Sequence, residues 1–469
     1  MQEPNSRVLG TLTLAMITVA AVVSLRNLSL LAELGFSAIF FLIVAALIFF
    51  IPIALVTAEL AATWPRAGGC YAWVGEAYGK PLAFISLWLS WMASVASFPA
   101  VLAFTAIMFA HMLAPIFPNL EHCTYFILLI MLVVFWGSTL TNFFGIEVSG
   151  FISSAGVIAG TIIPGALIII MGLWWVASGK PTHIPVHVES LVPDFKLDNL
   201  TLFAGVLLSL AGVELAAFHI RETKNPKKSY PRALLISIIL TLAIYIFATL
   251  AITVVVPQKD LSLGSGLIQA FYVFFTKVGM GWIVPLIALF LFVGAIAGIN
   301  AWVAGPAKGL LIVAQDGFLP TWLQRVNKHG VPTALLTSQA VVVSILAMLF
   351  LYIQDSSASI WFMNALASQF TVLQYGLVFL AALKLRSSQP LVLRAFEVPA
   401  LPLVAGLGLV ACAFSFLIVY APHAKLVSID FTTYCLLLIS SLLLLILPCL
   451  ILIKFRHRST TAKFTSKNY

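Results

Sequence analysis

Charged residues are scarce in this chain. Asp, Glu, Lys and Arg make up 9% of its 469 residues, whereas about 25% is usual in a soluble domain. Hydrophobic residues make up 62%, and the mean hydropathy is +1.09. This composition excludes a soluble globular protein. Apolar runs of roughly 20 residues, the length that a helix needs to cross a bilayer, recur along the chain. The sequence therefore predicts an all-α polytopic membrane protein.

Cysteine is also scarce, and the common catalytic motifs are missing. The five cysteines are scattered without a Cys-x-x-Cys pair, and the histidines lack the close paired spacing of metal ligands. We therefore predict neither a disulfide framework nor a metal site. The sequence contains no HExxH, no GxSxG and no Gly-rich phosphate-binding loop. We expect no enzyme activity, no cofactor and no ATP-driven pumping.

The net charge of +9 does not indicate a nucleic-acid-binding protein. Most of the 25 Lys and Arg residues lie in short loops between apolar segments. They concentrate on one side if both chain ends are cytoplasmic, as the positive-inside rule requires. We therefore expect the lipid bilayer as a partner, no nucleic acid, and an even number of spans.

Hydrophobic periodicity predicts twelve membrane spans. The first ten form two halves, 8–177 and 199–385. Two further helices occupy 399–454, and 456–469 form a short basic cytoplasmic tail. The predicted spans cover about 8–31, 37–63, 81–114, 123–142, 148–177, 199–220, 230–256, 282–313, 333–353, 358–385, 399–421 and 431–454.

Two of these spans carry signs of an interruption. The first contains the polar stretch Ser24-Leu-Arg-Asn27, and the sixth contains Gly212-Val-Glu214. Glycine weakens a helix, and a carboxylate within an apolar segment is costly. The two spans lie five helices apart, so they correspond if the second half repeats the first in inverted orientation. Paired interruptions of this kind are typical of transporters that bind their substrate near the bilayer midplane.

An interrupted helix leaves backbone N–H groups without partners, and these groups suit a carboxylate. We expect this role at the two interruptions and a cavity between them, walled by spans one, three, six, eight and ten. For the glycine of the sixth span, the alternative is that it only permits close helix packing. The predicted substrate-binding residues of the two interruptions are Val22, Val23, Ser24, Ala211 and Gly212.

Three acidic residues are candidates for proton sensing or gating. Glu214 lies beside the predicted interruption, and its alternative role is that of a buried structural acid. Glu59 and Glu222 flank cytoplasmic ends of spans. They are either solvated acids or partners of Arg66 or Arg221 in an inner gate.

Arg26 is the one basic residue that the topology assigns to neither side. An arginine near the bilayer centre costs at least about 2.5–3.5 kcal/mol on insertion scales, so it needs a reason. In one interpretation it lies about 27 Å along a straight helix from Val8, near the outer interface. In the other, the helix breaks at 22–24 and Arg26 faces the cavity, where it pairs with Glu33, Glu214 or the acidic side chain of a substrate. The sequence leaves both open.

Four segments of the chain carry a resemblance to a known family. They are Phe49–Leu60, Gly68–Val74, Gly212–Glu214 with the prolines that follow it, and Gly305–Pro320. With these segments, residues 8–455 resemble the amino acid–polyamine–organocation transporters, and look most like the bacterial glutamate/γ-aminobutyrate antiporter branch.

The resemblance implies an inverted five-plus-five fold with discontinuous helices one and six plus two extra helices. It also implies a location in the bacterial inner membrane and cavity-lining roles for Asn300, Trp302 and Tyr375. One departure is that 22–27 contain no glycine, although such transporters usually carry glycines there. Another is Arg26, because the branch looks aromatic near that position.

These observations lead us to expect a secondary active amino acid transporter that works by alternating access, and an antiporter of the glutamate/γ-aminobutyrate type. The alternatives are a proton-coupled uptake permease with a different substrate and, behind it, a channel. No repeated carbonyl-filter sequence favours a channel. The expected partner is a small amino acid, and the sequence leaves open whether it is acidic and in which oligomeric state the protein works.

Overall fold

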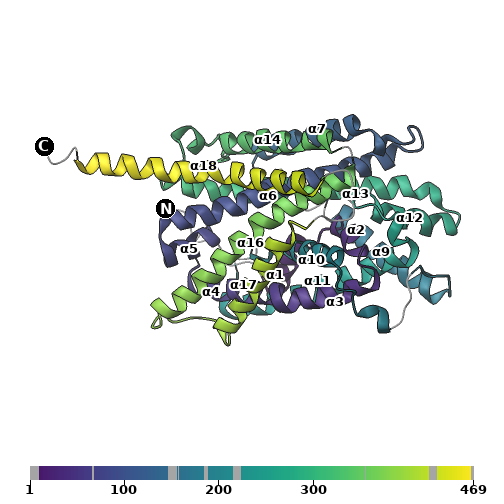
Figure 1. Ribbon diagram of the computed structural model, residues 1–469, viewed down its shortest axis with the longest axis horizontal. Helices are drawn as coiled ribbons and strands as arrows, with labels where there is room; N and C mark the ends of the chain where they lie inside the picture. The colour runs from purple at the N-terminus through teal and green to yellow at the C-terminus, as the bar shows by residue number, and fades with distance from the viewer. Residues whose placement is uncertain are drawn as a thin grey trace.

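The computed structural model describes residues 10–65, 68–145, 156, 158–183, 188–214, 223–353, 355–421 and 430–465. Within these ranges the chain forms helices and no strand, as expected (Figure 1). The principal helices are α1 (Thr11–Val22), α2 (Asn27–Ala32), α3 (Ala38–Ala45), the π-helix η2 (Ala46–Phe50), α4 (Ile51–Thr63), α5 (Cys70–Tyr78), α6 (Lys80–Leu113), α7 (Thr124–Phe143), the π-helix η4 (Ile158–Ile162), α9 (Ile163–Ala177), α10 (Leu197–Ser209), α11 (Pro226–Val255), α12 (Gly266–Lys277), α13 (Val284–Gln315), α14 (Thr333–Ala347), α15 (Leu349–Tyr352), α16 (Ser356–Ser388), α17 (Leu401–Ile418) and α18 (Phe431–Thr465).

The predicted count of twelve spans agrees with these helices. In the described part of the chain, ten helical segments are long and apolar enough to cross a membrane. Two apolar helices in sequence with them are shorter, α1 with 12 residues and α10 with 13. A helix of this length rises about 20 Å and falls short of the roughly 30 Å hydrocarbon core. The two short helices belong to the first and sixth spans, which the sequence marks as interrupted.

The first span breaks between Val22, the last residue of α1, and Asn27, the first of α2. Val23 is extended, with φ −75° and ψ 115°, and Arg26 has helical angles of −55° and −38°. No residue of 23–26 has a positive φ. These conformations are open to any L-residue, which explains how the helix breaks here without the glycines usual in similar transporters.

The sixth span breaks after Ser209, where α10 ends. Gly212 follows with a φ of 111°, a conformation that residues with a Cβ rarely adopt, so glycine is required there. A methyl group on Gly212 would lie 3.3 Å from the carbonyl oxygen of Ala21 in the first span. The two interruptions therefore approach each other closely. The predicted continuation of the span, 215–220, lies outside the described residues.

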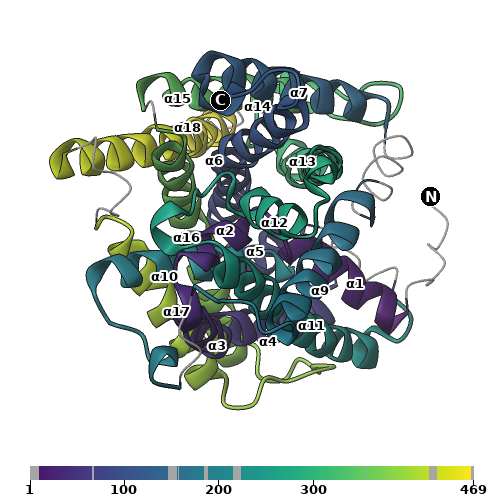
Figure 2. The ribbon, with the colours of Figure 1, turned by 90° about the vertical axis from the view of Figure 1, so that its right-hand side faces the viewer.

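The long helix α6 lies at the centre of the bundle and packs against α13, α16 and α7 (Figure 2). Gly160 in η4 faces Gly294 in α13 so closely that a side chain on either would collide with the other backbone. The two glycines therefore permit a close approach of the fifth and eighth spans.

Two helices complete the comparison with the sequence. The helix α12 lies between the predicted seventh and eighth spans and is amphipathic. The last helix, α18, continues to Thr465, beyond the predicted span end at 454, and extends past its neighbours in Figure 1.

Candidate functional site

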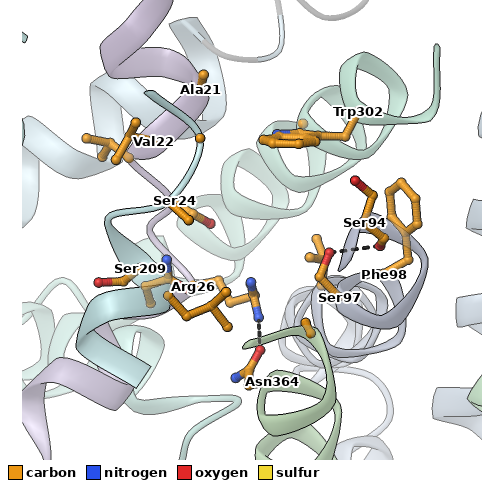
Figure 3. A pocket seen from close by; sticks show the side chains of 18 of the residues that line it. Ala21, Val22, Ser24, Arg26, Ser94, Ser97, Phe98, Ser209, Trp302 and Asn364 are labelled. Carbon is orange, nitrogen blue, oxygen red and sulfur yellow. Dashed lines mark hydrogen bonds between the residues drawn. The ribbon is translucent and has the colours of Figure 1, made fainter. Parts of the chain in front are cut away.

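A cavity of about 210 Å³ lies between the two interruptions (Figure 3). Its walls come from the five spans that the sequence predicted, and the fifth span adds two residues. Beyond the first span, hydroxyl groups and the two amides of Asn364 and Gln374 line the cavity. The lining residues are Ala20–Asn27 and Leu30 before and after the first interruption; Ser90, Ala93, Ser94, Ser97, Phe98, Val101 and Phe104 on α6; Gly160 and Thr161; Gly205, Leu208, Ser209, Ala211, Gly212 and Glu214; Leu291, Gly294, Ala295, Gly298, Ile299 and Trp302 on α13; and Asn364, Ala367, Thr371, Gln374 and Tyr375 on α16.

Most of the predicted site residues meet at this cavity. The exception among those predicted to bind substrate is Asn300, which is fully buried and does not line it. Its side-chain oxygen accepts hydrogen bonds from Thr141 Oγ1 at 2.9 Å and Asn142 Nδ2 at 2.7 Å. Asn300 therefore faces α7 and joins it to α13, and its predicted place in the cavity wall was wrong. The predicted residues that line the cavity are Val22, Val23, Ser24, Arg26, Ala211, Gly212, Glu214, Trp302 and Tyr375.

The backbone donors predicted to be free at the interruptions are bonded within the protein. The N–H of Ser24 donates to the hydroxyl of Tyr245 at 3.1 Å, and that of Gly212 donates to the hydroxyl of Tyr375 at 2.8 Å. The N–H groups of Val23 and Ala211 bond to carbonyls of the preceding helical turns. Buried backbone donors are costly unless paired, so tyrosines of neighbouring spans satisfy them.

Two backbone N–H groups of the first interruption make no hydrogen bond in the described part of the chain. No hydrogen bond within the described residues is donated by the N–H of Leu25 or of Arg26. Both residues line the cavity. These two groups take the place of the predicted donors at Ser24 and Gly212.

Tyr245 on α11 is a site residue that the sequence reasoning missed. Its hydroxyl accepts from the N–H of Ser24 and from Asn27 Nδ2, the latter at 3.3 Å. It also lies 2.9 Å from the carbonyl oxygen of Val22 and 3.1 Å from that of Ser209, and it can donate to one of them at a time. A single buried hydroxyl therefore joins both interruptions. The sequence offers only the weak signal of a tyrosine in the middle of a mostly apolar span.

Tyr375 on α16 links the sixth span to the opposite wall. Its hydroxyl donates to the carboxylate of Glu214 while it accepts from the N–H of Gly212. Glu214 makes no ion pair within the described residues. It therefore reaches the cavity as a carboxylate held by a neutral phenol.

Arg26 lines the cavity, so the interpretation in which the helix breaks and Arg26 faces the cavity holds, and the one that places it near the outer interface does not. Its Nη1 donates to Asn364 Oδ1 on α16 at 2.8 Å, and Figure 3 shows the side chain reaching from the first interruption toward that amide. Its Nε is buried without a hydrogen-bond partner in the described part of the chain. Arg26 forms an ion pair with neither Glu33 nor Glu214, nor with any other described acid.

Glu59 does not line this cavity. It is buried on α4 and forms ion pairs with Arg386, at the end of α16, and with Arg394 Nε at 3.2 Å. It also accepts the N–H of Val398 at 2.7 Å. Of its two expected roles, Glu59 is therefore a buried ion-pair partner rather than a solvated acid. The partners named for it, Arg66 and Arg221, lie outside the described residues. Glu222 lies outside the described residues.

Comparison with known proteins places this site in a family. The family model described as amino acid permease matches residues 9–450. The chain belongs to the amino acid permease family. The permease is therefore a multi-pass membrane transport protein and not an enzyme.

Three relatives show which transporters the chain is similar to. A transporter of Legionella pneumophila, described as uncharacterized, is 39% identical over 90% of this chain and 91% of its own. A glutamate/γ-aminobutyrate antiporter of Lactococcus lactis is 29% identical over 88% and 84%. A probable agmatine/putrescine antiporter of the same species is 27% identical over 78% and 77%. A small amino acid or polyamine is accordingly the class of substrate.

Proposed function

We propose that the permease is a secondary active antiporter that exchanges glutamate and γ-aminobutyrate across the bacterial inner membrane by alternating access, with both chain ends cytoplasmic. The observation that carries this proposal is a basic and an acidic side chain that line one cavity. Arg26 and Glu214 both line it, and they come from the two interrupted spans. An amino acid is a zwitterion and offers a partner to each.

The energetics of buried charge support this assignment. A charge taken out of water is costly unless it is paired. Arg26 and Glu214 do not pair with each other, and each is held by one neutral side chain, Asn364 or Tyr375. A bound zwitterion would supply both missing partners. Glu214 is also the candidate proton-sensing group, because ionisable residues within membrane spans commonly mark substrate or proton routes.

The relatives support exchange over one-way uptake. Two of the relatives above carry the word antiporter in their names, and one of them names glutamate and γ-aminobutyrate. Paired interruptions around a central cavity fit alternating access rather than a continuous pore. Proton-coupled uptake of another amino acid remains the second candidate, favoured by the single acid that lines the described cavity, Glu214.

Reconstitution in liposomes tests the proposal. Purified permease in vesicles loaded with unlabelled glutamate is expected to take up labelled glutamate and labelled γ-aminobutyrate, and empty vesicles are expected to take up neither. Protein-free vesicles are the control. Equal uptake into empty vesicles, driven by an imposed proton gradient, would replace exchange by proton-coupled uptake.

A further inference from the structure

One cationic side chain lines the cavity in the described part of the chain. Among the described lining residues, Arg26 is the only basic side chain. A guanidinium carries five N–H donors and no acceptor. One of the five is taken by the Asn364 oxygen, and Nε has no partner in the described part of the chain. Arg26 is thus built to receive a carboxylate that the protein itself does not supply.

The two proposed substrates share only one carboxylate. Glutamate has an α-carboxylate, an α-ammonium and a side-chain carboxylate. γ-Aminobutyrate is glutamate without the α-carboxylate, so it keeps the ammonium and the side-chain carboxylate. A cavity that exchanges one compound for the other must hold the carboxylate common to both.

We infer that Arg26, positioned by Asn364, binds the side-chain carboxylate of glutamate and the corresponding carboxylate of γ-aminobutyrate. This inference rests on the proposed function and names the group that selects its substrates. Arg26 is the only cation among the lining residues that the structure describes, so it is the group that can pair with the shared carboxylate in both compounds. The α-carboxylate, which only glutamate has, is left to the unpaired N–H groups of the first interruption, such as that of Leu25.

Asn364 explains why the guanidinium is available. Its amide oxygen fixes Nη1 at 2.8 Å without a negative charge. An acidic residue at position 364 would neutralise the charge of Arg26 and occupy the donors that a substrate carboxylate would use. Asparagine orients the donor fork and leaves its charge for a ligand. Asn364 is therefore a positioning residue for the side-chain subsite.

Two matched pairs of ligands test the inference by competition with exchange of labelled glutamate in vesicles. Glutamate and glutamine differ in the side-chain carboxylate, and γ-aminobutyrate and 4-aminobutanamide differ in the same group. We expect wild-type permease to prefer the acid in both pairs. Arg26→Gln is expected to reduce that preference roughly 10- to 100-fold, the range for a charge-assisted hydrogen bond. Arg26→Lys should restore part of it, because a point charge replaces the planar fork.

Asn364→Asp provides an independent variant of nearly the same volume. It gives Arg26 a carboxylate within the protein, so it should also remove the preference for the acids. Arg325→Gln, an exposed arginine in the loop after α13, is the matched control and should leave both preferences unchanged. Gel filtration shows whether each variant is folded. If Arg26→Gln does not fold, the result for Asn364→Asp tests the inference in its place.

The outcomes separate the inference from the proposed function. Equal weakening of all four ligands by Arg26→Gln, or an unchanged preference in Asn364→Asp, overturns the inference alone. A loss for glutamate and glutamine that spares γ-aminobutyrate would place Arg26 at the α-carboxylate and overturns it too. If wild-type permease exchanges neither glutamate nor γ-aminobutyrate, the proposed function fails, and the inference fails with it.

Discussion

The hydroxyl of Tyr375 donates a hydrogen bond to the carboxylate of Glu214, and this contact joins α16 to the interruption after α10. The same hydroxyl holds the N–H of Gly212. Hydrogen bonds to an ionised carboxylate are roughly twice as strong as bonds between neutral groups. Protonation of Glu214 is therefore expected to weaken the link between the two walls of the cavity, which would couple proton binding to opening.

Replacing Glu214 by glutamine tests this coupling. Glutamine keeps the size of the side chain and cannot ionise, so we expect the exchange rate to lose most of its dependence on pH between about pH 4 and pH 8. The measurement is exchange of labelled substrate in vesicles over that range. Asp198→Asn, an exposed acid in the first turn of α10, is the control. A Glu214→Gln permease with the wild-type pH profile would show that this acid is structural only.

Tyr375→Phe removes the hydroxyl and keeps the ring. The N–H of Gly212 and the carboxylate of Glu214 then each lose a partner. Unsatisfied buried groups cost about 1–3 kcal/mol, so we expect the exchange rate to fall by roughly tenfold or more. Tyr434→Phe is a matched control, because its hydroxyl donates to the Val419 carbonyl at 2.8 Å and does not line the cavity. Equal effects of the two changes would mean that the loss reflects general destabilisation.

The positions of the interruptions follow from local chemistry, and for that reason they were predictable. A polar stretch at 24–27 within an apolar run indicated the first break, and the structure has it at 23–26. A glycine beside an acid indicated the second, where Gly212 adopts a φ of 111°. Both signals lie within a few residues along the chain.

The partners of these residues were not predictable, because they lie far away in the sequence. Asn364 and Tyr245 are each one of several polar residues on their helices, and nothing local tells which face of the helix they occupy. Asn300 lies on the same helix as Trp302, but it faces α7 rather than the cavity. Glu59 was expected to be a solvated acid or a partner of Arg66 or Arg221, and nothing local indicated its ion pair with Arg386 from the tenth span. Such contacts depend on tertiary packing, which the pattern of one helix does not contain.

Glu59→Gln is expected to affect stability rather than selectivity. The Glu59 side chain is 3% exposed and that of Arg394 is 1% exposed, so glutamine would leave a buried cation without its counter-charge. Removing one partner of a buried pair costs roughly 3–5 kcal/mol. We expect a clear fall in the melting temperature of the purified permease, and an unchanged preference among the four ligands in the protein that stays folded.

An exposed ion pair is the control for this change. Asp194 Oδ2 and Lys196 Nζ lie 2.5 Å apart, and the two side chains are 59% and 77% exposed. Such pairs contribute about 0–1 kcal/mol, so Asp194→Asn should leave the melting temperature nearly unchanged. If Glu59→Gln is equally mild, the buried cluster does not stabilise the fold.

Tyr245→Phe should weaken every substrate alike. The Tyr245 hydroxyl is the partner of the Ser24 N–H and lies within 3.1 Å of the Ser209 carbonyl, so its loss loosens both interruptions at once. It does not bond to Arg26 or Asn364, so it has no part in distinguishing an acid from an amide. We expect glutamate, glutamine, γ-aminobutyrate and 4-aminobutanamide all to compete less well, by a similar factor of roughly tenfold. A loss confined to the two acids would mean instead that Tyr245 acts through Arg26, and that the first interruption is held by other contacts.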